Sequence, residues 1–190
     1  MLEHMPKVVG RALRGVGPGL DKLMATRDFP DAPDAITVTS AAFAEGAAIP
    51  AEHTEDVRVL SFPVAWRGVP AGAAEVVVVI EDADSPTPAP LVHAILFALP
   101  GRDGELAAGE LKSGGSEGRA HRLGQNSFLK AEYLPPDPPS GHGPHRYAVQ
   151  VFALDAALPL DGEPGRGALV EAMRGHVLAK GRLIGTYERA

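Results

Sequence analysis

Five polar side chains with complementary chemistry stand at the ends of three strand-like segments. Asp82 and Asp84 close one apolar run, His93 lies near the beginning of the next, and His145 and Tyr147 open a third. An aspartate that accepts a hydrogen bond from one imidazole nitrogen fixes the tautomer of the ring and favours its charged form, while a phenol adds a donor without charge. Such groups are typical of a small cavity that binds an anion, such as phosphate or a phosphorylated head group.

The spacing of these residues predicts which of them share a face. Residues two apart on a strand point to the same side, so we expect Asp82 and Asp84 to point together, and His145 and Tyr147 to do the same. Two neighbouring carboxylates repel each other unless a proton, a cation or a basic side chain compensates their charge. His93 and His145 are the candidates for that compensation.

Three other interpretations of these residues stay open. Aspartate and histidine side chains can ligate a divalent metal, although the spacing matches no H-E-x-x-H or similar motif. A Ser-His-Asp hydrolase needs an activated serine, but the chain has no G-x-S-x-G elbow, and Ser85, Ser127 and Ser140 lie in loop or proline-rich contexts. Each aspartate or histidine alone can also be a loop cap or a satisfied core group. Because neither the metal motif nor the serine elbow is present, we expect a site without a resident metal or cofactor.

Composition and charge restrict the class of protein. The chain has 190 residues with 24 acidic and 18 basic side chains, a formal net charge of −6 and no cysteine. This length suits one domain with a sizeable core, and the acidic balance argues against a nucleic-acid partner. The lack of cysteine excludes disulfides and thiolate chemistry and fits a reducing compartment. With no signal-peptide pattern and no run of about 18 apolar residues, we expect a cytoplasmic protein without an integral membrane segment.

The hydrophobic patterns predict a mainly β protein. Alternating or β-branched runs predict strands at residues 36–40, 75–81, 92–99, 147–154 and 182–187. Helical spacing predicts a late helix at 168–180, with His176 as a core histidine on its buried face. It also predicts an N-terminal helix at 6–16, which Pro18 separates from a shorter helical piece. Since no helices separate most of the strands, we expect an antiparallel, Greek-key-like β-sandwich rather than a parallel α/β sheet.

The chain divides into two predicted parts. Residues 1–34 form an amphipathic helical extension, and residues 35–190 form the β-sandwich domain. The polar face of the extension is short and interrupted by glycines, so we expect it to pack on the domain or on a second copy in a homodimer. The interval 101–144 is too long for an ordinary connection and is typical of a functional loop, and the prolines of 134–141 make its end stiff.

Five motifs follow one another along most of the chain. They are SFPVAWRGVP at 61–70, DADSP at 82–86, PPSGHGPHRY at 138–147, AMRGHVLA at 172–179 and GTY at 185–187. In this order they resemble the phosphatidylethanolamine-binding protein family, and specifically its bacterial branch, often labelled Raf kinase inhibitor-like. The resemblance runs from about Ile36 to the C-terminus.

The resemblance implies an antiparallel β-sandwich with a small anion-accepting pocket. The residues that it carries over as lining this pocket are Asp82, Pro86, His93, Pro139, His145 and Tyr147. It also makes the Ser85–Pro86 bond a candidate for the cis form. The chain departs from the usual pattern at Ala83, Leu91 and Ala98, where a proline, an aromatic residue and an asparagine are common, so the wall of the pocket is expected to be less aromatic.

These observations favour a non-enzymatic, regulatory binding protein for a small anionic or phosphorylated ligand. Asp82 is expected to orient an imidazole, His93 and His145 to donate hydrogen bonds, and Tyr147 to add a hydroxyl, while no residue is assigned a catalytic role. One alternative is a hydrolase or lyase that uses Asp82 or His93 as general base. Another is an interaction protein whose pocket docks a phosphorylated partner.

Overall fold

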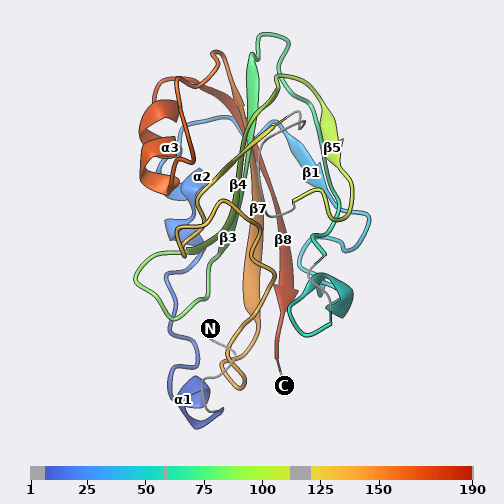
Figure 1. The fold of residues 1–190 in the computed structure, drawn as a ribbon, viewed down its shortest axis with the longest axis vertical. Coiled ribbons are helices and arrows are strands. Elements are labelled where there is room, and N and C mark those ends of the chain that lie inside the picture. Colours follow the sequence, from blue (N-terminus) through green and yellow to red (C-terminus); the bar gives the residue numbers. More distant parts are fainter. Residues whose placement is uncertain (1–6, 58–59, 112–120, 190) are drawn as a thin grey trace.

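Two antiparallel β-sheets form the molecule, in a computed structural model that describes residues 7–57, 60–111 and 121–189. The large sheet has the strand order β6-β4-β3-β7-β8, and the small sheet has the order β1-β2-β5 (Figure 1). The strands of the large sheet are β3 (Glu75–Asp82), β4 (Leu91–Pro100), β6 (Arg122–Gly124), β7 (His145–Leu154) and β8 (Val177–Tyr187). Those of the small sheet are β1 (Thr37–Thr39), β2 (Val64–Arg67) and β5 (Gly104–Leu106). The predicted antiparallel β-sandwich is confirmed.

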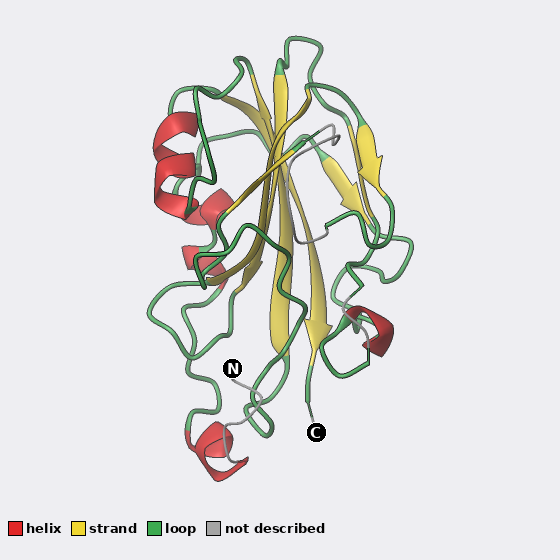
Figure 2. Cartoon of the chain, viewed as in Figure 1, coloured by secondary structure: helices red, strands yellow, loops and turns green. Residues whose placement is uncertain are grey.

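Short helices complete the fold (Figure 2). They are α1 (Lys7–Ala12), η2 (Leu20–Lys22), α2 (Met24–Arg27), η3 (Ala51–His53) and α3 (Arg166–Met173). Helices α2 and α3 lie on one face of the large sheet, and the small sheet lies on the other side (Figure 1). In the described part of the chain, no helix is long and apolar enough to cross a membrane.

The unbroken apolar run of β3 follows from burial on both of its faces. Val76, Val78 and Ile80 belong to the core between the two sheets, whereas Val77 and Val79 belong to the core under α2 and α3. Successive side chains of a strand point to opposite faces, so each neighbour enters a different core. A strand covered in this way needs no alternating polar residues.

The predicted helix at 168–180 is wrong in its second half. Helix α3 ends at Met173, and the chain turns through Gly175, whose φ of +79° is in the left-handed region that glycine adopts at little cost. Strand β8 then begins at Val177, so His176 lies on no helical face. Its side chain is 44% exposed, and its Nδ1 lies 2.7 Å from a carboxylate oxygen of Asp155. His176 is therefore a surface residue rather than a core histidine.

A buried carboxylate ties the helices to the large sheet. Glu81 accepts hydrogen bonds from the backbone N–H of Met24 at 2.8 Å, from Nε2 of Gln150 at 2.8 Å and from Nε of Arg166 at 2.7 Å. Arg166 also donates to Asp28 at 2.8 Å. Because the Glu81 side chain is fully buried, its charge depends on these partners.

Removing this carboxylate should strongly destabilise the fold. We expect Glu81→Ala to lower the free energy of unfolding by about 3–5 kcal/mol, because the guanidinium of Arg166 then loses its most buried partner. Urea unfolding followed by circular dichroism measures the change. The matched control is Glu171→Ala, which removes an exposed carboxylate paired with Arg174 and should cost less than about 1 kcal/mol. Equal losses in the two variants would contradict this account.

Candidate functional site

The end of β3 and the beginning of β7 bring an aspartate, a histidine and a tyrosine together. Asp82 pairs in register with Tyr147, and its Oδ2 accepts a hydrogen bond from Nδ1 of His145 at 2.7 Å. The rings of His145 and Tyr147 are stacked, with centroids 6.4 Å apart and an interplanar angle of 25°. All three residues are buried, so the Asp82 carboxylate depends on this hydrogen bond from the imidazole.

A β-bulge in β4 turns His93 toward the same group. The register with β3 skips one residue of β4 between Val92 and Ala94, so His93 is the extra residue of the bulge. Bulges re-aim side chains and are common beside functional sites. The His93 ring meets the Tyr147 ring edge to face, with centroids 5.2 Å apart. Three strands therefore contribute to one cluster.

His142 extends this cluster toward the N-terminal part of the chain. Its Nδ1 lies 2.9 Å from Nε2 of His145, and the two ring centroids are 4.7 Å apart. The residue is only 3% exposed, so its ring belongs to the buried cluster. Gly141 and Gly143 on either side have φ of +81° and +109°, which lets the turn direct the ring inward. The two glycines that flank His142 were the signal in the sequence that could have indicated its inward position.

One proton decides whether the hydrogen-bonded series Asp82–His145–His142 presents a donor or an acceptor to a ligand. Either a neutral His145 accepts from Nδ1–H of His142, or a charged His145 donates to that nitrogen. The outer Nε2 of a neutral His142 is a lone pair in the first state and an N–H donor in the second. Burial and the charge of His145 lower the pKa of His142, against the opposing effect of the backbone carbonyls of Leu13 and Val16. His142 is therefore the neutral member of the pair.

His93 and Tyr147 are neutral at physiological pH. Burial lowers the pKa of His93 and raises the pKa of Tyr147 well above its usual range. Nδ1 of His93 lies 2.8 Å from the carbonyl oxygen of Leu134, which can only accept, so the ring proton sits on Nδ1. Nε2 of His93 therefore offers a lone pair, and the donor role that the sequence predicted for His93 does not fit this tautomer.

Four buried polar atoms in this region have no hydrogen-bond partner among the described residues. They are Nε2 of His93, Nε2 of His142 and the hydroxyl oxygens of Tyr133 and Tyr147. Buried polar groups are nearly always paired, and an unpaired one costs about 1–3 kcal/mol. Four such atoms together are typical of a site that a polar ligand or water completes. The sequence offered no signal for Tyr133, which stands in the long loop before the proline-rich stretch.

Asp84 leaves the cluster, and the expectation that it points together with Asp82 is wrong. Its carboxylate accepts hydrogen bonds from Nε and Nη2 of Arg146 at 2.7 Å and 2.6 Å. The residue lies beyond the end of β3, where the strand alternation no longer holds. Burial acts to raise the pKa of Asp84, but the hydrogen bonds and the charge of Arg146 outweigh it and hold the pKa below its ordinary value.

The two prolines of the predicted site lie in the loops beside it. Pro139 is buried, and its carbonyl oxygen accepts a hydrogen bond from the backbone N–H of His142 at 3.2 Å. Pro86 is partly exposed in the turn that follows Asp84. The described residues contain no cis peptide bond, so the expected cis form at Ser85–Pro86 is not found.

The alternative chemistries find little support in the geometry. Oγ of Ser85 lies 2.6 Å from Oγ1 of Thr87 instead of next to an imidazole, so no base activates it. Within residues 7–57, 60–111 and 121–189, no three histidine, aspartate or glutamate side chains are grouped so that they could hold a metal ion.

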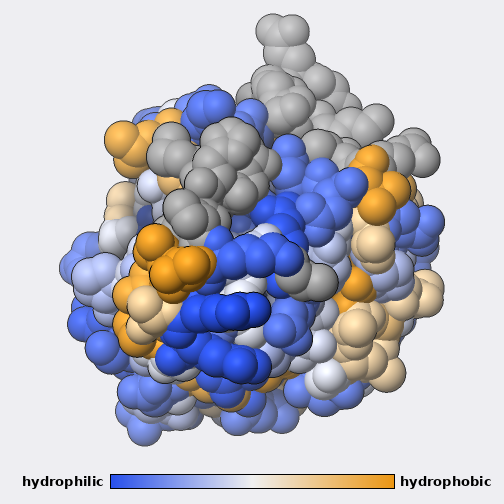
Figure 3. Space-filling view, turned by 90° about the horizontal axis from the view of Figure 1, so that it is seen from below, coloured by the Kyte–Doolittle hydropathy of each residue, from blue (hydrophilic) through white to orange (hydrophobic). Residues whose placement is uncertain are grey.

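The N-terminal segment lies against this end of the molecule, below the beginning of β7 in Figure 1. A Cβ added to Gly10 would lie 2.2 Å from the carbonyl oxygen of Ser140, and one added to Gly17 would lie 2.8 Å from Cα of Asp84. A pocket of about 190 Å³ lies between the segment and the loop; its lining residues are Arg14, Gly15, Val16, Asp84, His142, Gly143 and Pro144. Figure 3, a view from below, shows hydrophilic side chains at the centre of this end and apolar patches on its flanks.

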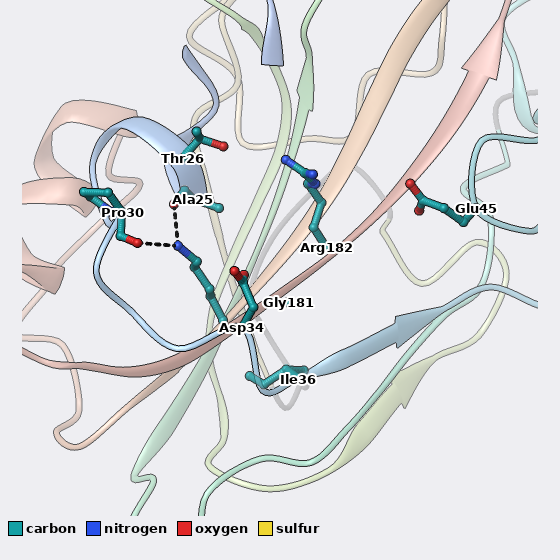
Figure 4. A pocket seen from close by; sticks show the side chains of 9 residues that line it. Ala25, Thr26, Pro30, Asp34, Ile36, Glu45, Gly181 and Arg182 are labelled. Carbon is teal, nitrogen blue, oxygen red and sulfur yellow. Dashed lines mark hydrogen bonds between the residues drawn. The ribbon is translucent and has the colours of Figure 1, made fainter. Parts of the chain in front are cut away.

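A larger hollow of about 550 Å³ lies between α2 and β8 (Figure 4). Its buried Lys180 donates through Nζ to the carbonyl oxygens of Ala25, Phe29 and Pro30 at 3.0, 2.7 and 3.2 Å. The three protons of the ammonium are thus already used. None of the buried, unpartnered atoms of the described residues lines this hollow, so the histidine cluster is the stronger candidate site.

Comparison with known proteins agrees with this architecture. The family model described as phosphatidylethanolamine-binding protein matches residues 39–188. The chain belongs to the phosphatidylethanolamine-binding protein family. The N-terminal segment up to residue 38 lies outside that match.

Relatives and solved structures resemble most of the chain. A UPF0098 protein of Pyrococcus abyssi is 34% identical over 151 residues, which are 79% of this chain and 84% of that protein. One of Mycobacterium tuberculosis is 36% identical over 165 residues, which are 85% of this chain and 76% of that protein. The crystal structure of a putative phosphatidylethanolamine-binding protein homologue from Chlamydia trachomatis has a TM-score of 0.73 and 31% identity, over 83% of this chain and 99% of that one. Escherichia coli YbcL, with a TM-score of 0.74 and 23% identity over 82% of this chain and 99% of its own, shares the fold.

The ion pair of Asp84 and Arg146 should make stability depend on pH. We expect Asp84→Asn to lower the free energy of unfolding at pH 7 by about 1–2 kcal/mol, because it removes a charge-assisted pair. The pKa of Asp84 in the folded protein is below its ordinary value of 3.8, so the stabilisation is present above pH 3.8 and is lost as the pH falls through the lowered pKa. Urea unfolding at pH 7 and pH 3 measures this, with exposed Asp31→Asn as control. A difference between wild type and Asp84→Asn that grows at pH 3 would contradict the prediction.

Proposed function

We propose that this protein binds a small phosphate-bearing anion without converting it, at the cluster of Asp82, His93, His142, His145 and Tyr147. The observation that carries the proposal is the set of buried, unpartnered polar atoms around one hydrogen-bonded aspartate–histidine pair. A polar ligand would restore the hydrogen bonds that these atoms lack, and that gain would contribute to its affinity.

The donors and acceptors of the cluster match a hydrogen phosphate group. The hydroxyl of Tyr147 can donate to a phosphoryl oxygen, and Nε2 of His93 can accept from a P–OH group or from the ammonium of phosphoethanolamine. Protonation of the pair His142–His145 supplies a positive charge beside Asp82. The net charge of −6 does not oppose binding, because charges farther away than about 8 Å are largely screened.

A hydrolase or lyase is the second candidate function. The neutral His93, with its proton fixed on Nδ1 and its lone pair on Nε2, has the form that a general base needs. A phosphorylated protein partner fits the site less well than a small molecule. Because the unpartnered atoms are buried, a ligand that is small enough to be enclosed can reach them, whereas the surface of a protein cannot. Cytoplasmic location, a regulatory role and pairing of two copies stay predictions from the sequence.

Calorimetric titration with inorganic phosphate tests the proposed site. We expect His145→Asn to weaken phosphate binding at least tenfold, because it removes the charge-bearing ring next to Asp82. The matched control is His176→Asn, a surface histidine paired with Asp155, which should bind like wild type. Parallel titrations with phosphoethanolamine and glycerophosphoethanolamine separate a free phosphate monoester from a lipid-like diester, which should bind more weakly because it carries less negative charge.

Absence of phosphate and phosphoethanolamine binding by wild type, or equal binding by both histidine variants, would overturn the proposal. Turnover of a phosphate ester that disappears in His93→Ala would instead favour the second candidate function.

Tyr147→Phe should separate binding from stability. The variant removes a buried hydroxyl that has no partner in the free protein, so we expect the free energy of unfolding to stay unchanged or to rise by up to about 1 kcal/mol. Phosphate affinity should nevertheless fall about tenfold. Tyr187→Phe removes a hydroxyl that donates to Asp56, so this control should lose stability and keep its affinity. The opposite pattern would remove Tyr147 from the site.

A further inference from the structure

We infer that the N-terminal segment is a wall of the ligand site, in which Arg14 and Nε2 of His142 together hold the anion in the pocket of about 190 Å³. This inference rests on the proposed function and adds Arg14 to the residues that contact the ligand. Arg14 stands outside the residues 39–188 that match the family model, so this contact is a property of this chain.

The size of the pocket suits a small ligand. Sites for drug-sized molecules have volumes of about 300–1,000 Å³, and the pocket beside His142 is smaller than this range. It is bounded on one side by residues 14–16 and on the other by the turn from His142 to Pro144. A group of phosphate size fits such a space better than a phospholipid does.

His142 lines this pocket and provides a buried nitrogen beside it. Its Nδ1 is used by His145, so Nε2 on the other side of the ring points away from the Asp82 pair. This Nε2 is buried and has no hydrogen-bond partner, and the residue as a whole is 3% exposed. The backbone carbonyls of Leu13 and Val16 lie close to the ring, and an anion in the pocket would compete with them for Nε2–H.

Arg14 provides a cation whose guanidinium forms no hydrogen bond or ion pair with the other residues that the structure describes. It lines the pocket, and a Cβ added to Gly143 would lie 3.6 Å from its Nε. The one carboxylate that lines the pocket, Asp84, is held by both Nε and Nη2 of Arg146 and by the backbone N–H of that residue. The charge available to a ligand is therefore positive.

Anion binding at Nε2 of His142 is linked to the uptake of one proton. The nitrogen donates only in the state in which His145 is charged, and that state has one proton more than the state with both rings neutral. The charged and titratable groups that surround His142 and set this equilibrium are Arg14 of the N-terminal segment, Asp82 and Asp84 at the end of β3, and His145 and Arg146 of β7. The affinity of the protein for the anion should accordingly fall as the pH rises, by up to about tenfold per pH unit.

Calorimetric titration of the full chain with inorganic phosphate tests the inference. We expect Arg14→Gln to weaken phosphate binding about five- to tenfold, because it removes a charge-assisted contact. Arg27→Gln, which removes an exposed arginine of α2 that does not line the pocket, should bind like wild type. At a pH well above the second pKa of phosphate, titrations in two buffers of different ionisation enthalpy should give uptake of one proton by wild type and none by His142→Phe, whose ring has no nitrogen to pass the charge of His145 on to the anion.

The outcomes distinguish this inference from the proposed function. If wild type binds phosphate and His145→Asn does not, but Arg14→Gln binds like Arg27→Gln, the N-terminal wall is refuted and the proposed function stands. If His142→Phe still takes up a proton, the linkage through Nε2 of His142 is refuted. If wild type binds no phosphate at all, the proposed function itself fails. Because Arg14 is exposed, its substitution should leave the fold intact, and circular dichroism confirms this.

Discussion

The antiparallel pairing of β3 with β7 is the constraint on which the candidate site depends. It places Asp82 opposite Tyr147, and His145 then reaches the Asp82 carboxylate at 2.7 Å. A slip of one residue would turn every side chain of the strand to the other face, where α2 and α3 pack. The two apolar cores on either side of β3 thus hold the register, and the register holds the hydrogen bond between Asp82 and His145.

Two acidic residues that are neighbours in sequence serve opposite sides of the large sheet. Glu81 compensates the charge of Arg166 on the helical side, whereas Asp82 accepts a hydrogen bond from His145 on the other side. Both charges are buried, so each needs a partner that is close and correctly oriented. Glu81 uses its hydrogen-bonding capacity to anchor helices and leaves nothing for a ligand. The histidines around Asp82 keep free nitrogens, and this difference separates a structural network from a candidate binding site.

The unpartnered atoms of His93, His142 and Tyr147 carry a cost in the free protein. This cost favours the binding of a polar ligand, because the ligand supplies the hydrogen bonds that these atoms lack in the free protein. The N-terminal segment lies over this region through close backbone contacts at Gly10 and Gly17, positions where a larger residue would collide with the loops beneath. The segment therefore contributes to the enclosure of the site, which limits the size of what can bind.

The sequence by itself determined the long strands, the two-sheet class and the identity of the residues that could bind an anion, because β-branched runs and motif order are local signals. It did not reveal β2, β5 and β6, whose three or four residues are too few for a periodic pattern. It also extended the late helix through Gly175, because apolar spacing alone does not report a left-handed turn. Only the tertiary structure decided that Asp84 turns away to Arg146, that a bulge aims His93 inward and that His142 joins His145. These outcomes depend on contacts between segments far apart in the chain, whose energies no local pattern contains.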